Sequence, residues 1–242
     1  MKSVSLDPIG YIESEFTEKF GIPRQGLGQS PQTCRLRLRP DLQPELSLES
    51  LSGFSHLWLI GVFHKAQQKK WKAKVRPPRF QDQSIGVFAT RSPHRPNPIS
   101  LTLVEIVSLD GPLLTLKGCD LLDGTPILDI KPYLPEVESV PQARRGWLEA
   151  AADLKLSVEW SSKTPIPEGM EETLRARLSQ DPRPRHKRKH QEVHGIRIGT
   201  YNVVFQVVGQ KCFVLKVEEG GSFRSARPAQ RAASNGEAPA KN

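Results

Sequence analysis

Prolines divide this sequence into short segments, and this constrains its fold more than any other feature does. The chain has 21 prolines and 18 glycines in 242 residues. Proline removes a backbone hydrogen-bond donor and breaks helix interiors, so we expect no long helices. The apolar segments between the breaks are short, which predicts many short strands joined by turns. This pattern is typical of a small β-barrel or a β-sandwich.

The first 135 or so residues contain most of these strand patterns. Cys34, Leu36 and Leu38 alternate with arginines, as on a half-buried strand. We expect strands at residues 34–38, 57–63, 85–89, 99–106, 113–116 and 127–130, and the almost continuously apolar 57–63 should be covered on both faces. Asp110-Gly111 predicts a hairpin between two of them, and Asp123-Gly124 predicts the turn before the last.

The composition changes after about residue 140. We expect a helical connector at 146–152, a strand at 154–160, and one clear helix from Pro167 to about Gln180, with acids early and arginines late. Residues 196–208 and 212–217 predict a second hairpin around Gly209-Gln210. The chain is therefore expected to be mainly β (α+β): a small β-barrel domain at 1–145, a small α+β domain at 146–218, and a disordered basic tail at 219–242.

The charge balance favours a polyanionic partner such as nucleic acid. Lys and Arg total 35 against 26 Asp and Glu, which gives a formal net charge of +9. The three cysteines lie far apart, which disfavours a disulfide scaffold and indicates a reducing cytoplasm. No apolar run is long enough to span a membrane, and the first residues lack the apolar region of a secretory signal, so we expect a cytoplasmic protein.

Residues 76–98 form the most unusual segment. Arg76, Arg79, Arg91 and Arg95 lie among several prolines, with Asn97 beside them. Proline stiffens a loop, and arginines on a stiff loop suit bidentate capture of a phosphate or a carboxylate. The alternative is a proline-rich surface loop with solvated arginines.

Two other segments are less specific taken alone. Residues 119–135 carry Asp120, Asp123 and Asp129 around a glycine turn; they could hold ribose hydroxyls or a cation, or form an ordinary hairpin turn. Residues 181–194 are rich in Lys and Arg and hold three histidines spaced by four. We reject a metal site there, because no cysteine or paired acid completes a ligand set. The segment is interpreted as a phosphate contact or as a solvated loop.

These segments together resemble the TsaA-like family, in order and from about residue 5 to 217. The motifs are PRQ at 23–25, FSHLWLI at 54–60, VFHK at 62–65, VRPPR at 75–79, GVFATRSPHRPNPI at 86–99, DLLDGTP at 120–126, DIKPYLP at 129–135 and DPRP at 181–184. The sequence has no GxGxxG after a strand, P-loop, GxSxG or HExxH motif, so a Rossmann-type site is not indicated.

The resemblance implies a β-barrel that binds S-adenosyl-L-methionine and methylates N6 of threonylcarbamoyladenosine next to the anticodon of tRNA. It also implies a homodimer with the methyl-donor site near the subunit interface. By similarity, the donor-site residues are Pro23, Arg24, Gln25, His64, Lys65, Arg91, Leu101, Asp120, Leu121, Leu122, Asp123, Gly124, Thr125 and Pro126. Lys65 stands where other family members carry glutamine, so the resemblance supports a backbone role at this position and does not carry over a side-chain role.

The chemistry of the reaction adds further candidates. The acceptor nitrogen must lose a proton, and a base would help; His64, Asp129 and Tyr133 are the candidates, without a ranking. The tRNA phosphates and the threonylcarbamoyl group need cationic and polar partners. For these we expect Arg76, Arg79, Arg95, Asn97, Arg183, Arg185, Lys187, Arg188 and Lys189.

Two alternative functions stay open at this point. The chain could be a non-enzymatic RNA-binding barrel whose arginines contact only phosphates, in which case it would not bind S-adenosylmethionine. It could also be a small-molecule methyltransferase of the same family, which the net charge of +9 argues against.

Overall fold

The N-terminal part of the chain forms a closed, six-stranded antiparallel barrel. The computed structural model describes residues 4–17, 22, 32–66, 71–77, 83–149, 155–183 and 192–220. The barrel strands are β1 (Gly10–Glu13), β2 (Thr33–Leu38), β3 (His56–Val62), β6 (Ile99–Asp110), β7 (Leu113–Lys117) and β8 (Pro126–Pro132), in the spatial order β1-β2-β7-β6-β3-β8. Closure leaves no unpaired sheet edge and encloses an apolar interior.

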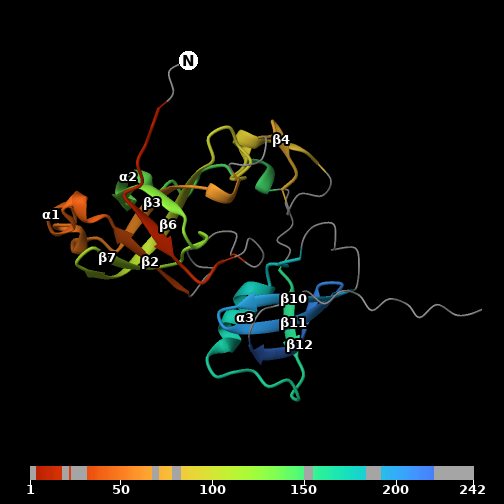
Figure 1. Ribbon diagram of the computed structural model, residues 1–242. Coiled ribbons are helices and arrows are strands. Elements are labelled where there is room, and N and C mark those ends of the chain that lie inside the picture. The colour runs from red at the N-terminus through yellow and green to blue at the C-terminus, as the bar shows by residue number, and fades with distance from the viewer. Residues whose placement is uncertain are drawn as a thin grey trace, which may run out of the picture.

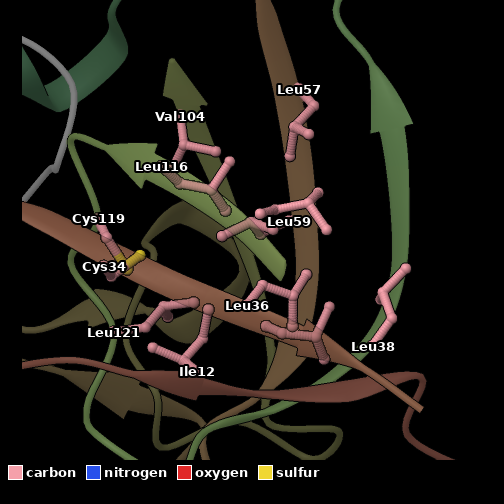
Figure 2. Close-up of a cluster of buried hydrophobic side chains, with 12 residues drawn as sticks. Ile12, Cys34, Leu36, Leu38, Leu57, Leu59, Val104, Leu116, Cys119 and Leu121 are labelled. Carbon is pink, nitrogen blue, oxygen red and sulfur yellow. The ribbon is translucent and has the colours of Figure 1, made fainter. Parts of the chain in front are cut away.

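The alternation of apolar and polar residues determines which face of each strand points into the barrel. Cys34, Leu36 and Leu38 of β2 point into the barrel while the arginines between them face solvent, as expected. Figure 2 shows these side chains meeting others from β1, β3, β6 and β7, with the sulfur atoms of Cys34 and Cys119 side by side. The hairpin of β6 and β7 closes at Asp110 and Leu113, which confirms the predicted turn.

Strand β3 differs from its prediction. Leu57 and Leu59 are fully buried, whereas Trp58, Ile60 and Val62 are only half-buried, so the strand is not covered equally on both faces. The outer face of a barrel strand has no second layer to cover it. The strand expected at residues 85–89 is also shorter: β5 (Ile85–Gly86) pairs with β4 (Lys74–Val75) and then gives way to the 3-10 turn η4 (Val87–Ala89).

The remaining helical elements of the barrel part are single turns. They are η1 (Pro40–Leu42), α1 (Pro44–Ser47), η2 (Leu51–Gly53), η3 (His64–Ala66), α2 (Pro135–Glu138) and η5 (Gly146–Leu148). No helix in the described ranges is long and apolar enough to cross a membrane.

The C-terminal part forms a second core. Its sheet has the order β10 (Val193–Ile198), β11 (Tyr201–Val208), β12 (Lys211–Glu219) and β9 (Ser157–Trp160), with β9 parallel to β12. Helix α3 (Met170–Leu178) buries Leu174 and Leu178 completely against this sheet (Figure 1). This core is built from residues 156–217 and the barrel core from residues 12–127, so the chain is a β-barrel followed by a small α+β unit.

Three expectations for this part need correction. The segment 196–208 is not one strand, because Gly199, with φ of +60°, and Thr200 turn the chain between β10 and β11. The helix begins at Met170, after Gly169 with φ of +75°, and not at Pro167. Strand β12 extends through Glu219, where the tail was expected to start; residues 221–242 lie outside the described residues.

Candidate functional site

A cavity of about 200 Å³ lies beside the barrel, where β3 ends and the connection from β7 to β8 passes. The residues that line it come from segments far apart in sequence. They are Ile22, Phe63, His64, Lys65, Ala66, Pro93, Asp120, Leu121, Leu122 and Thr125. Most are apolar, and Asp120 contributes a carboxylate.

The Asp120–Thr125 wall is held by hydrogen bonds to the barrel. Thr102 Oγ1 of β6 donates to Asp120 Oδ1 at 2.7 Å, and Thr102 is 6% exposed. Thr125 Oγ1 donates to the carbonyl of Leu122 at 2.6 Å, and Gly124, with φ of +71°, completes this turn. The carboxylate of Asp120 therefore has a fixed place at the cavity.

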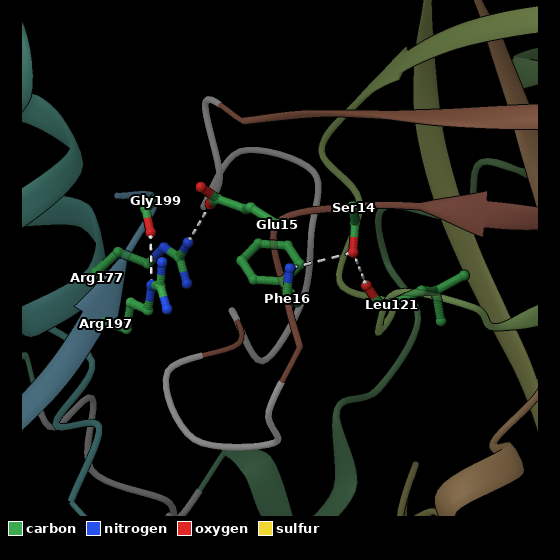
Figure 3. A network of polar contacts seen from close by, with 7 residues as sticks. All are labelled: Ser14, Glu15, Phe16, Leu121, Arg177, Arg197 and Gly199. Carbon is green, nitrogen blue, oxygen red and sulfur yellow. Dashed lines mark hydrogen bonds and ion pairs between the residues drawn. The ribbon is translucent and has the colours of Figure 1, made fainter. Parts of the chain in front are cut away.

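The segment that follows β1 supports the same wall from outside. Ser14 donates its backbone N–H to Asp123 Oδ1 at 3.0 Å. Its hydroxyl donates to the Leu121 carbonyl at 3.0 Å (Figure 3). The Asp123 N–H donates to the Phe16 carbonyl at 2.9 Å. Lys65 Nζ donates to the Thr17 carbonyl at 2.8 Å, so the side chain of this residue joins the opposite wall to the same segment.

Six of the donor-site residues expected from the sequence line this cavity: His64, Lys65, Asp120, Leu121, Leu122 and Thr125. Asp123 and Gly124 lie on the same connection and Pro126 begins β8, and none of the three lines the cavity. Arg91 and Leu101 are exposed and do not line it either. Pro23, Arg24 and Gln25 lie outside the described residues.

The structure separates the three candidate bases. His64 lines the cavity. Tyr133 packs edge-on against Trp58, and its N–H donates to the His56 carbonyl, at the opposite end of β3. A seven-residue strand spans about 20 Å, so Tyr133 does not join the cavity of its own chain. Asp129 pairs with Ile60 between these two ends and forms an ion pair with Lys131 at 2.9 Å.

The residues expected to contact tRNA also differ in their surroundings. Arg76 and Asn97 are exposed, as a surface contact requires. Arg95 is half-buried and donates to the carbonyls of Val87 at 3.3 Å and Thr90 at 3.0 Å, so it holds the η4 loop together. Arg79, Arg185, Lys187, Arg188 and Lys189 lie outside the described residues.

Arg183 corrects the expectation for the basic segment. It is 7% exposed, and its Nε and NH2 groups donate to the two carboxylate oxygens of Asp181 at 2.8 and 3.1 Å. Asp181 has φ of +49°, and its side chain also accepts the Arg183 N–H. This guanidinium is therefore bound inside the C-terminal unit and does not face a phosphate.

Sequence reasoning missed four residues of the cavity and one that supports it. Phe63 was assigned to a strand, Pro93 was noted only as part of the stiff loop, Ile22 lay beside the PRQ motif without a role of its own, and no pattern marked Ala66. Thr102, whose hydroxyl donates to Asp120, has no feature in the sequence that distinguishes it from other strand residues. Among the described residues no group of three or more His, Cys, Asp or Glu could hold a metal ion.

The cavity suits an organic cation with an apolar ring. Phe63, Leu121, Leu122 and Pro93 offer apolar surface, and Asp120 offers a carboxylate that can accept hydrogen bonds from hydroxyl or ammonium groups. The adenosyl ring, ribose hydroxyls and positive charge of S-adenosylmethionine match this set of groups.

Comparisons with known proteins agree with the architecture. The model for the tRNA-methyltransferase O N-terminal domain matches residues 11–139, and the TrmO C-terminal domain matches residues 150–220. The chain is 40% identical over 210 residues to the "Putative S-adenosylmethionine-dependent methyltransferase RcsF" of Pseudomonas aeruginosa, covering 82% of this chain and 90% of that protein.

Two further matches span nearly the whole length of the proteins concerned. The chain is 36% identical over 237 residues to the tRNA (adenine(37)-N6)-methyltransferase of Escherichia coli K12, covering 89% of this chain and 99% of that protein. The crystal structure of TrmO from Pseudomonas aeruginosa superposes with a TM-score of 0.72 at 35% identity, over 90% of this chain and 99% of that one. The chain therefore belongs to the tRNA-methyltransferase O (TrmO) family.

Proposed function

We propose that this chain is an S-adenosylmethionine-dependent methyltransferase that modifies N6 of the adenosine next to the anticodon of tRNA. The observation that carries the proposal is the cavity between η3 and the Asp120–Thr125 wall, which combines apolar surface with one fixed carboxylate. The names of the full-length relatives support the reaction class. The net charge of +9 supports an RNA substrate.

The chemistry of the residues that line the cavity supports a role for each in holding the methyl donor. Phe63, Leu121 and Leu122 would flank the adenine ring, and Asp120 would accept hydrogen bonds from the ribose hydroxyls or the ammonium group. The bound donor supplies an electrophilic methyl group on a sulfonium. Rigid walls position it for an in-line transfer, and positioning contributes much of the acceleration in such reactions.

His64 is our choice for the group that takes the proton from the acceptor nitrogen, because it alone of the three candidate bases lines the cavity. The lone pair of N6 delocalises into the purine ring, so removal of the proton makes the nitrogen a better nucleophile. We expect His64→Gln to lower kcat by about 100-fold, the lower end of what a general base contributes. Single-turnover methylation at saturating donor would measure this; an unchanged rate would exclude His64.

The finer proposal is that the substrate is threonylcarbamoyladenosine. Its carboxylate needs a cationic partner. Arg91 is exposed on the loop that carries Pro93 and Arg76 is exposed after β4, whereas Arg95 is engaged by loop carbonyls. The carbamoyl group also makes the N6 proton more acidic. Labelled donor offered to unmodified transcript and to threonylcarbamoylated tRNA should methylate only the second; equal turnover would contradict this specificity.

We also propose a homodimer and a division of labour between the two units. Ile99 and Leu101 of β6 are 42% and 52% exposed, an apolar surface that a second copy would cover beside the donor site. The barrel, residues 1–145, would bind the donor. Residues 146–219, which include the basic segment at 181–194, would bind tRNA in the cytoplasm. Sedimentation of the parent chain and of Leu101→Asp tests the dimer: the parent should sediment as a dimer and the variant as a monomer.

Calorimetry with S-adenosylmethionine separates this proposal from the alternatives. A non-enzymatic RNA-binding barrel would show no donor affinity. A small-molecule methyltransferase would bind the donor and leave tRNA unmethylated. Mass spectrometry of tRNA nucleosides, from a deletion strain with and without this gene restored, then tests the methylated product directly.

A further inference from the structure

The C-terminal unit contacts the barrel through a buried cation. Arg177 of α3 has a side chain that is 3% exposed, and its NH2 group lies 2.6 Å from Glu15 Oε1. Its guanidinium carbon lies 4.5 Å from the centre of the Phe16 ring, and Phe16 is 6% exposed. Figure 3 shows the two residues of the barrel side reaching toward Arg177 from the segment that follows β1.

This contact pairs a buried guanidinium with a carboxylate. Burial lowers the pKa of Arg177, and the Glu15 carboxylate opposes that shift. A buried guanidinium that loses its carboxylate partner is strongly disfavoured. The other oxygen of Glu15 lies against the turn between β10 and β11, where a Cβ on Gly199 would be 3.3 Å from Oε2. Two elements of the C-terminal unit therefore fix the position of Glu15.

The same short segment supports the cavity. Ser14 holds the Leu121 carbonyl and the Asp123 carboxylate, Phe16 accepts the Asp123 N–H, and Thr17 accepts from Lys65. A displacement of residues 14–17 would therefore move both walls of the cavity. Glu15 and Phe16 therefore connect Arg177 to the cavity wall.

We infer that Arg177 and Glu15 are positioning residues: docking of the C-terminal unit onto Glu15 and Phe16 sets the geometry of the methyl-donor cavity. This inference rests on the proposed function, because the ligand of the cavity is the donor named there. The C-terminal unit then contributes to donor affinity even in the absence of tRNA.

Donor affinity of the full chain tests the inference. We expect Glu15→Gln and Arg177→Met each to raise the Kd for S-adenosylmethionine about tenfold, a usual size for coupling between two sites. In turnover the donor KM should rise, while the KM for tRNA stays within about twofold, since the exposed cations that would contact tRNA are untouched. The double variant should bind no more weakly than the weaker single variant, because both changes break one contact.

Arg175→Met provides a matched control on the same helix. Arg175 stacks on Trp160 at 4.3 Å and donates to the Val158 carbonyl at 2.9 Å, so its contacts stay inside the C-terminal unit. It should leave the donor Kd unchanged. Thermal unfolding checks that each variant is folded; if Arg177→Met is not, Glu15→Gln decides, because that side chain is 25% exposed and keeps its shape.

The outcomes separate this inference from the proposed function. A parent chain without donor affinity would refute the proposed function. A parent that binds the donor, with folded Glu15→Gln binding it equally well, would refute only the positioning role. An equal loss in Arg175→Met would show a general effect of α3 stability and would also overturn the inference.

Discussion

At the residue scale, close contacts between strands require glycine at two positions in the barrel. A Cβ on Gly10 would lie 2.2 Å from the Arg37 carbonyl oxygen, and one on Gly61 would lie 2.8 Å from the Pro126 carbonyl oxygen. Both distances are too short for a real side chain beside backbone atoms. Glycine at these positions lets β1 approach β2 and β3 approach β8, and so allows the barrel to close.

We expect Gly10→Ala to lower the free energy of unfolding by about 2 kcal/mol, because overpacking against neighbouring atoms costs about 1–3 kcal/mol. Gly86→Ala is the control: nothing lies within 4 Å of its Cβ and φ is −54°. That change should be neutral or stabilise slightly. Urea unfolding of both variants measures the difference, and equal midpoints would mean that β1 shifts without cost.

The buried thiols make stability depend on pH in the alkaline range. Burial raises the pKa of Cys212 from 9.0 to about 12, with Asp181 adding to the shift and Arg183 opposing it. The folded thiol keeps its proton where the unfolded chain has lost it. The free energy of unfolding therefore falls as pH rises from about 9 toward about 12, by up to about 1.4 kcal/mol per pH unit.

Cys212→Ala isolates this contribution. Urea unfolding at about pH 7, about pH 9 and about pH 11, which lie below, near and above the ordinary thiol pKa, should show a smaller loss of stability in the variant than in the parent. Cys119 acts in the same direction in both proteins, because its hydrogen bond with Cys34 and its burial raise its pKa. Parallel pH profiles would show that Cys212 titrates equally in the folded and unfolded chains.

At the element scale, strands that alternate strictly and a turn marked by Asp-Gly were predictable, whereas the turn between β10 and β11 was not. The period of two in residues 34–38 and Asp110-Gly111 correctly predicted β2 and the β6–β7 hairpin. The turn at Gly199-Thr200 was missed, although the buried apolar positions change phase across it, from Ile196 and Ile198 to Val203 and Phe205. A period of two indicates where a strand lies, but the end of the strand is predictable only where a strong turn signal interrupts the pattern.

The cavity was partly predictable, and its supports were not. The connection at residues 120–126 and the pair His64 and Lys65 were found through the family motifs. Arg183 was misassigned because a sequence does not distinguish a solvated arginine from a buried one, and its partner Asp181 is recognised only when the backbone brings the two together. Thr102 was missed because its partner Asp120 lies on another element.

The hydrogen bond between β6 and the β7–β8 connection can be tested directly. Thr102→Val keeps the side-chain shape and removes the donor to Asp120 Oδ1. We expect the Kd for S-adenosylmethionine to rise about fivefold, because a hydrogen bond to a charged group contributes about 1.5–3 kcal/mol and part of this is recovered by solvent. Ser179→Ala, which removes a hydroxyl bond to the Ala176 carbonyl, should leave donor affinity unchanged.

At the scale of the whole molecule, the basic residues fall into two groups. Some are engaged by carboxylates or carbonyls within the fold, and others are exposed at the surface. The chain carries a net charge of +9, yet Arg177 and Arg183 are buried and paired with carboxylates, and Arg95 binds loop carbonyls. Neutralising exposed cations should therefore weaken tRNA binding, whereas removing the engaged ones should act on the fold or, for Arg177, on the donor cavity.

The basic segment after α3 offers a direct comparison of the two kinds of cation. Changing Arg185, Lys187, Arg188 and Lys189 to Gln should reduce the dependence of tRNA affinity on salt, by up to about 0.9 in the log–log slope for each phosphate that is no longer neutralised. Arg183→Met, only two residues away, should instead lower the free energy of unfolding by about 3 kcal/mol, because Asp181 is left buried without its cation. Filter binding of tRNA across a salt series and urea unfolding of both variants measure these effects. An unchanged salt slope in the fourfold variant would assign tRNA binding to another surface, such as the loop with Arg76 and Arg91. Unchanged stability in Arg183→Met would show that water can replace the buried guanidinium.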